Sequence, residues 1–179
     1  FSGQTQYISF VKTRCIVFWT KNPAPFLKHL KTIEQMGIGV LFQVTVNDYE
    51  TEKLELNLPP LKTRIDSVVE LSKNIGKEKV LWRFDPLILS EKIPIRELLK
   101  KIARVGDELS PHAGRLTISF LSLYKKVVSN LKPFGVHEIS KLDKIKSASG
   151  INDLNTRWNL QLFSCAEPED LSEYGIAHG

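Results

Sequence analysis

The sequence predicts an α/β fold in which parallel strands alternate with helices, as in part of a (β/α) barrel. Two observations support this class. Apolar, β-branched runs recur along the chain, and an amphipathic helix pattern lies between most runs and the next. The runs are continuous rather than alternating, which is typical of strands covered on both faces, as in parallel sheets. The five runs are Cys15–Trp19, Val40–Val46, Val80–Phe84, Leu116–Phe120 and Leu160–Cys165.

The first two helices are predicted from proline at their starts and glycine at their ends. Pro23 suits the first turn of a helix after the first strand, and Gly37 suits its C-terminal cap. A polar loop over residues 47–58 follows the second strand, and Pro60 then opens a helix that Gly76 closes. Their apolar faces comprise Phe26, Leu27, Leu30 and Ile33 in the first helix, and Leu61, Ile65, Val68, Val69 and Ile75 in the second.

Three further helices are predicted along the rest of the chain. Pro94 opens the third, Pro133 stops the fourth, and the fifth and longest follows Ser140. Gly150 inside the fifth helix costs about 1 kcal/mol relative to alanine, which weakens that assignment. Their apolar faces comprise Ile95, Leu98, Leu99, Ile102 and Val105, then Leu123, Val127 and Leu131, then Leu142, Ile145, Ile151 and Leu154.

Successive βα units of this kind build either a doubly wound sheet or a barrel, with right-handed crossovers. No glycine-rich phosphate fingerprint follows the first strand, which weighs against a dinucleotide-binding domain. Five strands cannot close a standard eight-stranded barrel. We therefore predict one incomplete domain over residues 1–179 with a partial TIM-like (β/α) barrel fold, or a fragment of one.

Composition excludes several functional classes. The formal net charge of +5 permits nucleic-acid binding, but the lysines are spread over every predicted helix, which favours a solvated surface. No apolar run approaches the roughly 20 residues that cross a bilayer, so no membrane partner is expected. The first residues carry no signal-peptide pattern, which predicts a cytoplasmic protein. The two cysteines, Cys15 and Cys165, form no disulfide framework, and no histidine pair has metal-ligand spacing.

Arg83 and Asp85 are the most informative residues at a strand end. Being two apart, they point to one face of the third strand. A charge inside a buried strand costs several kcal/mol unless it is paired. Arg83 should therefore meet a carboxylate or an anionic ligand, bidentately where possible. The alternative is an internal arginine–carboxylate brace between strands.

The other strand ends also carry polar candidates with structural alternatives. Lys21 and Asn22 suit an anion or carboxylate site, or else a capping turn before the next helix. Gln43 and Thr45 share one face, so they either line a cavity or are tolerated polar residues. Glu167 suits a general base or an amine contact, or else an ion pair with Lys21 or Arg83.

Two candidates lie outside the predicted strands. Tyr124 begins a helix, where a surface role and a site role are equally plausible. His178 lies at the end of the chain, where a lone histidine is usually exposed. The Tyr-Gly-Ile segment before it makes His178 a candidate binding residue. No serine–histidine–acid set can be argued. The remaining strand-end candidates for substrate or cofactor binding are Thr20, Ser119 and Cys165.

Five colinear segments together resemble one bacterial family, domain of unknown function 1848. The resemblance runs in order over essentially the whole chain. The segments are residues 15–23, 57–60 with 64–65, 82–86, 118–120 with Tyr124, and 165–179.

The resemblance implies a six-stranded partial barrel related to radical S-adenosylmethionine enzymes. Members of the family usually begin with one more strand and end in a cysteine-rich tail suited to a [4Fe–4S] cluster, and neither part is present in this sequence. Such a cluster needs about three or four thiolates. We therefore expect this chain to bind no metal by itself and to have the missing C-terminal segment as its partner.

Four hypotheses follow for the function. In the first, the strand-end residues line the mouth of a radical S-adenosylmethionine-like barrel of unknown substrate. Arg83 then binds the anionic end of the ligand, such as the methionyl carboxylate, and Asp85 and Glu167 are the catalytic carboxylates or bind the amine. The second is an iron-independent barrel enzyme that uses Asp85 and Glu167 in acid–base catalysis. The third is a basic module that binds nucleic acid or a partner. The fourth is a truncated gene product with no activity of its own.

Overall fold

The sheet has six parallel strands that follow one another in chain order. The computed structural model describes residues 9–123 and 131–179, so Tyr124 lies outside the described residues. The α/β class with a parallel sheet is confirmed, and the last strand was not predicted. The strands are β1 (Cys15–Thr20), β2 (Gly39–Thr45), β3 (Val80–Leu87), β4 (Arg115–Phe120), β5 (Gln161–Ser164) and β6 (Ile176–His178).

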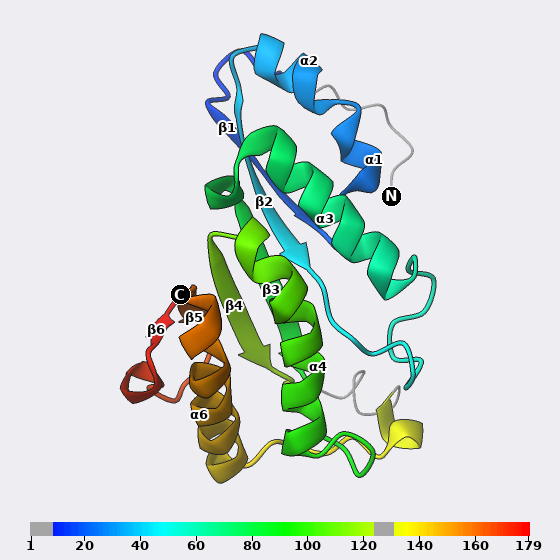
Figure 1. Cartoon of the computed structure of the whole chain (residues 1–179), viewed down its shortest axis with the longest axis vertical. Coiled ribbons are helices and arrows are strands. Elements are labelled where there is room, and N and C mark those ends of the chain that lie inside the picture. Colours follow the sequence, from blue (N-terminus) through cyan, green and yellow to red (C-terminus); the bar gives the residue numbers. More distant parts are fainter. Residues whose placement is uncertain (1–8, 124–130) are drawn as a thin grey trace.

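The helices cover one face of this sheet. In Figure 1, α3, α4 and α6 all lie in front of the strands. A strictly sequential strand order excludes a doubly wound sheet, in which the order reverses at a switch point. The arrangement is compatible with part of a barrel wall, and no pairing of β1 with β6 is seen among the described residues. The helices are α1 (Ala24–Leu27), α2 (Leu30–Gln35), α3 (Leu61–Ile75), α4 (Ile95–Leu109) and α6 (Lys141–Trp158).

The predicted helix with Leu123, Val127 and Leu131 falls mostly outside the described residues. Within the described ranges, no helix combines the length and the apolar character that crossing a bilayer requires.

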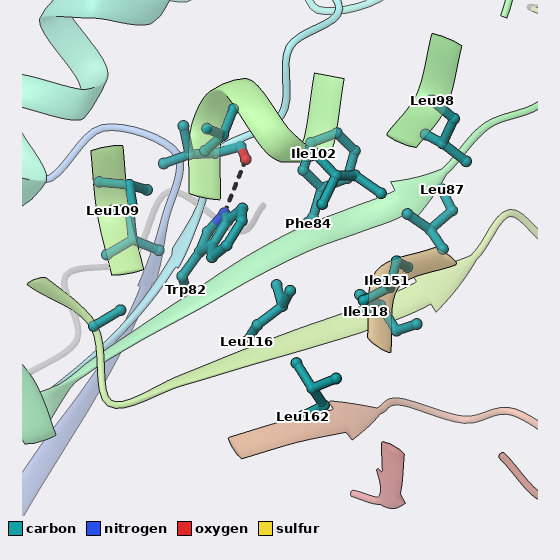
Figure 2. Close-up of a cluster of buried hydrophobic side chains, with 14 of the residues drawn as sticks. Trp82, Phe84, Leu87, Leu98, Ile102, Leu109, Leu116, Ile118, Ile151 and Leu162 are labelled. Atoms are coloured by element: carbon teal, nitrogen blue, oxygen red, sulfur yellow. Dashed lines mark hydrogen bonds between the residues drawn. The ribbon is translucent and has the colours of Figure 1, made fainter. Parts of the chain in front are cut away.

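The hydrophobic core lies between the sheet and the helices. Trp82 and Phe84 of β3 and Leu116 and Ile118 of β4 are almost completely buried and face this layer (Figure 2). The indole of Trp82 donates to the carbonyl oxygen of Val46 at 3.1 Å, so its polar atom is satisfied inside the core.

Two glycines allow α4 and α6 to approach closely. A Cβ atom on Gly106 would lie 2.3 Å from the Trp158 ring, and one on Gly150 would lie 2.4 Å from Leu99. The helix propensity of Gly150 suggested only that this residue weakens the helix, but it also has a packing role. It offsets its intrinsic cost by permitting contact between the two helices.

The opposite face of the sheet is covered by none of the described helices, and we call it the open face. In β4, Leu116, Ile118 and Phe120 point to the helices, whereas the alternate residues point to the open face. On β1, the Trp19 side chain is 64% exposed. The expectation that the strands are covered on both faces is therefore wrong for the described residues. The open face carries Val17, Trp19, Gln43, Thr45, Arg83, Asp85, Arg115, Thr117, Ser119 and Phe163.

Candidate functional site

A polar network joins three neighbouring strands at the carboxyl end of the open face. Arg83 of β3 donates from Nε and Nη2 to Oδ2 of Asp85, at 3.0 and 2.7 Å. Its Nη1 donates to Oε1 of Gln43 on β2 at 3.0 Å, and the Ser119 hydroxyl on β4 donates to Oδ1 of Asp85. The predicted pairing of Arg83 with a carboxylate is present, but both partners lie on β3, and the contacts with Gln43 and Ser119 are what join β3 to its neighbours.

The network keeps Arg83 charged although its side chain is only 5% exposed. Burial by itself lowers the pKa of Arg83, but its interactions with Cys165 and Asp85 outweigh burial and raise that pKa above its ordinary value. The guanidinium carbon also lies 4.6 Å from the centroid of the Trp19 ring. The Asp85 side chain is 20% exposed, so it is the most accessible member of this ion pair.

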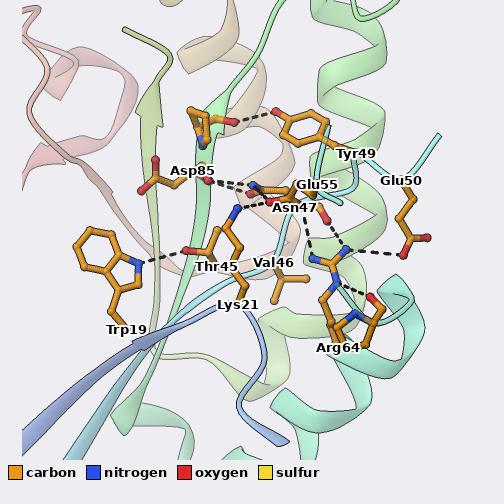
Figure 3. A network of polar contacts seen from close by, with 12 residues as sticks. Trp19, Lys21, Thr45, Val46, Asn47, Tyr49, Glu50, Glu55, Arg64 and Asp85 are labelled. Atoms are coloured by element: carbon orange, nitrogen blue, oxygen red, sulfur yellow. Dashed lines mark hydrogen bonds and ion pairs between the residues drawn. The ribbon is translucent and has the colours of Figure 1, made fainter. Parts of the chain in front are cut away.

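Two side chains from β2 and the loop after it hold the network in place. Asn47 donates to the carbonyl oxygen of Asp85 at 2.9 Å and accepts from the Asp85 amide at 2.9 Å (Figure 3). Thr45 accepts from the Trp19 indole at 3.3 Å. Thr45 is therefore occupied by Trp19, and Gln43 by Arg83.

Lys21 lies at the same end of the sheet and, among the described contacts, is linked to this network only through Glu55 and Asn47. It forms an ion pair with Glu55, which also accepts from Asn47 at 3.1 Å. A neighbouring cavity of about 310 Å³ is lined by Lys21, Asn47, Tyr49, Leu54, Glu55, Pro86, Ile88, Leu121 and Leu131.

Thr20 and Asn22 form a local turn, which was the structural alternative for Asn22. The Thr20 hydroxyl donates to the Asn22 carbonyl oxygen at 3.0 Å and accepts from the Asn22 amide at 3.1 Å. The Asn22 side chain accepts from the Ala24 amide at 3.2 Å. These contacts shape the chain between β1 and α1 and assign neither residue to a ligand.

Glu167 forms no described ion pair with Lys21 or Arg83, which was the structural alternative for it. It accepts from the Phe120 amide at 2.8 Å and pairs with Lys144 of α6 at 3.0 Å. The preceding Ala166 has a φ of +57°, so the chain turns sharply after β5. Its ion pair is thus with a helix residue that sequence analysis had not considered.

The contacts around Glu167 join elements of the fold rather than form part of the polar network on the open face. Burial lowers the pKa of Lys144, but hydrogen bonds to Glu169 and Glu167 outweigh it, and the Lys144 pKa is raised. His178 places its Nε2 atom 3.1 Å from the carbonyl oxygen of Glu167, and no described contact joins it to the open face.

Sequence analysis missed three residues of the open face. The guanidinium carbon of Arg115 lies 4.7 Å from the centroid of the Phe163 ring, and Thr117 lies between Arg83 and Phe163 in the register of the sheet. The signal was present in the sequence, because residues 115–119 alternate polar and apolar. The apolar character of the neighbouring residues obscured it.

The described residues do not fit an iron–sulfur cluster. They contain no group of three or more His, Cys, Asp or Glu side chains that could hold a metal ion. Cys15 lies on β1 and Cys165 follows β5, with three strands between them. Two thiols separated by three strands are too few and too far apart to ligate one cluster.

A comparison with known protein families finds a match over the whole chain. A family model described as domain of unknown function (DUF1848) matches residues 1–179. No curated protein matches the chain.

Proposed function

Because this chain belongs to the DUF1848 family, we propose that it is the ligand-binding core of a barrel-type enzyme related to radical S-adenosylmethionine enzymes. One observation carries the proposal. Gln43, Arg83, Asp85 and Ser119 converge from three strands on a face that no described helix covers. In barrels, ligands bind at the carboxyl ends of the strands, and these four residues lie there.

The chemistry of this site favours a cationic ligand. Asp85 is partly exposed and can accept a hydrogen bond from an ammonium group. The exposed Trp19 ring packs against the Arg83 guanidinium, and an aromatic π face attracts cations. S-adenosylmethionine carries both an ammonium group and a sulfonium group. Arg83 already donates to Asp85 and Gln43, so its role here is to position Asp85 rather than to bind the ligand alone.

The proposal assigns binding, and no iron-dependent step, to the residues of this chain. The cluster ligands would come from a cysteine-rich segment, which we propose as the partner of this fold. An acid–base enzyme that pairs Asp85 with Glu167 has less support, because Glu167 pairs with Lys144 instead.

Calorimetric titration with S-adenosylmethionine tests the binding role. We expect saturable binding that Asp85→Asn weakens about tenfold, since a charge-assisted hydrogen bond is replaced by a neutral one. The matched control is Asp66→Asn, which removes the same charge from the exposed surface of α3. Absence of binding, or equal affinities of the two variants, would exclude the proposed site.

A second experiment tests the reaction class. The full-length gene product is reconstituted with iron and sulfide under anaerobic conditions and supplied with a reductant and S-adenosylmethionine. We expect cluster absorbance and release of 5′-deoxyadenosine. If neither appears, the radical chemistry is rejected, and turnover of any substrate without iron would favour the acid–base alternative.

A further inference from the structure

A second arginine on the open face is not used by the proposed function. Arg115 begins β4 and lies in register with Leu81 on one side and Gln161 on the other. It forms no ion pair with any acidic side chain among the described residues. Its charge is therefore not balanced locally, unlike that of Arg83.

Two buried donors lie together at this position without acceptors. Nε of Arg115 and Oγ1 of Thr117 are both buried, and neither has a hydrogen-bond partner in the part of the chain that the structure describes. The Thr117 side chain as a whole is only 4% exposed. Buried polar atoms without partners are rare in folded proteins, and they call for an explanation such as a missing ligand.

The two side chains are arranged to act together. They are two residues apart on one strand, so they point to the same face and lie about 6.6 Å apart along it. Phe163 is in register with Thr117, and its ring packs against the Arg115 guanidinium at 4.7 Å. This contact restrains the plane of the guanidinium. A guanidinium fork matches the oxygens of a carboxylate or phosphate, and the hydroxyl supplies a further donor.

We propose that Arg115 and Thr117 form a binding site for the oxyanion group, a carboxylate or a phosphate, of a small-molecule ligand on the open face. The sequence pattern had indicated Arg83 as the contact for the anionic end of a ligand. The structure favours Arg115, because Arg83 is already paired with Asp85, whereas Arg115 has no ion-pair partner among the described residues. The inference does not rest on the proposed function, since oxyanion binding requires neither iron nor S-adenosylmethionine.

Nuclear magnetic resonance of the arginine side chains tests this site directly. The ¹⁵N-labelled protein is titrated with inorganic phosphate and, separately, with succinate. We expect a saturable shift of the Arg115 Nε–H signal in at least one titration, and the stronger response identifies the class of oxyanion. If all arginine signals shift without saturation, the cause is a change in ionic strength, and the proposal is overturned.

Three variants define the site. Arg115→Gln should abolish binding, and Thr117→Val should weaken it about tenfold, which is the effect of removing one hydrogen bond to a charged group. Arg96→Gln removes the same charge from the exposed surface of α4 and should bind as the unaltered protein does. Equal affinities of the Arg115 and Arg96 variants would refute the site.

Thermal unfolding separates binding from folding. Without ligand, Thr117→Val should melt no lower than the unaltered protein, because the hydroxyl that it removes has no partner in the described ranges of the chain. A lower melting temperature with unchanged phosphate affinity would show that the hydroxyl serves folding instead, and would overturn its assignment to the ligand.

Discussion

Two arginine–carboxylate clusters lie at the carboxyl end of the sheet, and they differ in what surrounds them. Arg83 and Asp85 lie on the open face, beside the exposed ring of Trp19. Arg64 and Glu55 lie between the loop after β2 and helix α3, and both side chains are almost completely buried. Figure 3 shows Asn47 between the two carboxylates, with contacts to Glu55 and to the backbone of Asp85.

The enclosed cluster holds the backbone of a loop. Arg64 donates to the carbonyl oxygens of Pro59 and Asn47 at 3.1 and 3.2 Å, and its Nη1 lies 3.6 Å from Glu55. Tyr49 from the same loop donates to the Pro86 carbonyl oxygen at 2.9 Å. An arginine that binds main-chain carbonyls has a structural role. An arginine that orients a partly exposed carboxylate next to an aromatic ring is suited to ligand binding.

The largest effect that we expect comes from the enclosed cluster. Arg64→Met should lower the free energy of unfolding by about 3–5 kcal/mol, because buried Glu55 then keeps only Lys21 as a cation among the described residues. The carbonyl oxygens of Pro59 and Asn47 also lose their donor. Urea unfolding measures this, with Arg96→Met on the exposed surface of α4 as the control. A loss of the same size in both variants would remove the distinction between the two clusters.

The open cluster should respond less in stability and more in binding. Asp85→Asn should cost about 1.5–3 kcal/mol, since the amide still accepts one hydrogen bond from Arg83 and water reaches the site. Its affinity for S-adenosylmethionine should fall at the same time. A variant that unfolds as easily as Arg64→Met, measured in the same urea series, would show that Asp85 too is mainly structural.

Asn47 links the two clusters, and we expect its loss to lower the free energy of unfolding less than the loss of Arg64 or Asp85 does. Asn47→Ala removes the side-chain contacts to Asp85 and Glu55 and should cost about 1–2 kcal/mol. A double-mutant cycle with Asp85→Asn measures whether the two residues act together. Strict additivity would mean that the two clusters are independent.

The exposed ion pair of Arg157 with Asp107 should have the smallest effect on stability, and it serves as a reference for both clusters. Burial raises the pKa of Asp107, but hydrogen bonds from Arg157 and Trp158 together outweigh it and lower that pKa below its ordinary value of 3.8. The stabilisation by this carboxylate is therefore complete above pH 3.8 and is lost as the pH falls through its lower native pKa. Melting temperatures of the unaltered protein and Asp107→Asn should converge as the pH falls below 3.8. A difference that persists at low pH would contradict the assignment.

Local periodicity explains which parts of the site were predictable. Arg83 and Asp85 share a face because they are two apart in one strand, and this needs no tertiary information. The same rule identified Gln43 with Thr45, and it would have identified Arg115 with Thr117 had the strand been read as alternating. β6 was missed because three residues are too few for a pattern to emerge.

The sequence alone determined the order of the first five strands and the pairing of Arg83 with Asp85 and of Gln43 with Thr45 on one face, because these depend on residues close together in the chain. The tertiary structure alone decided that Lys21 pairs with Glu55 and that Glu167 pairs with Lys144. It also decided which face of the sheet stays free of helices. Partners between elements depend on the register of neighbouring strands and on the side to which each crossover turns, and neither property is encoded in a short run of residues.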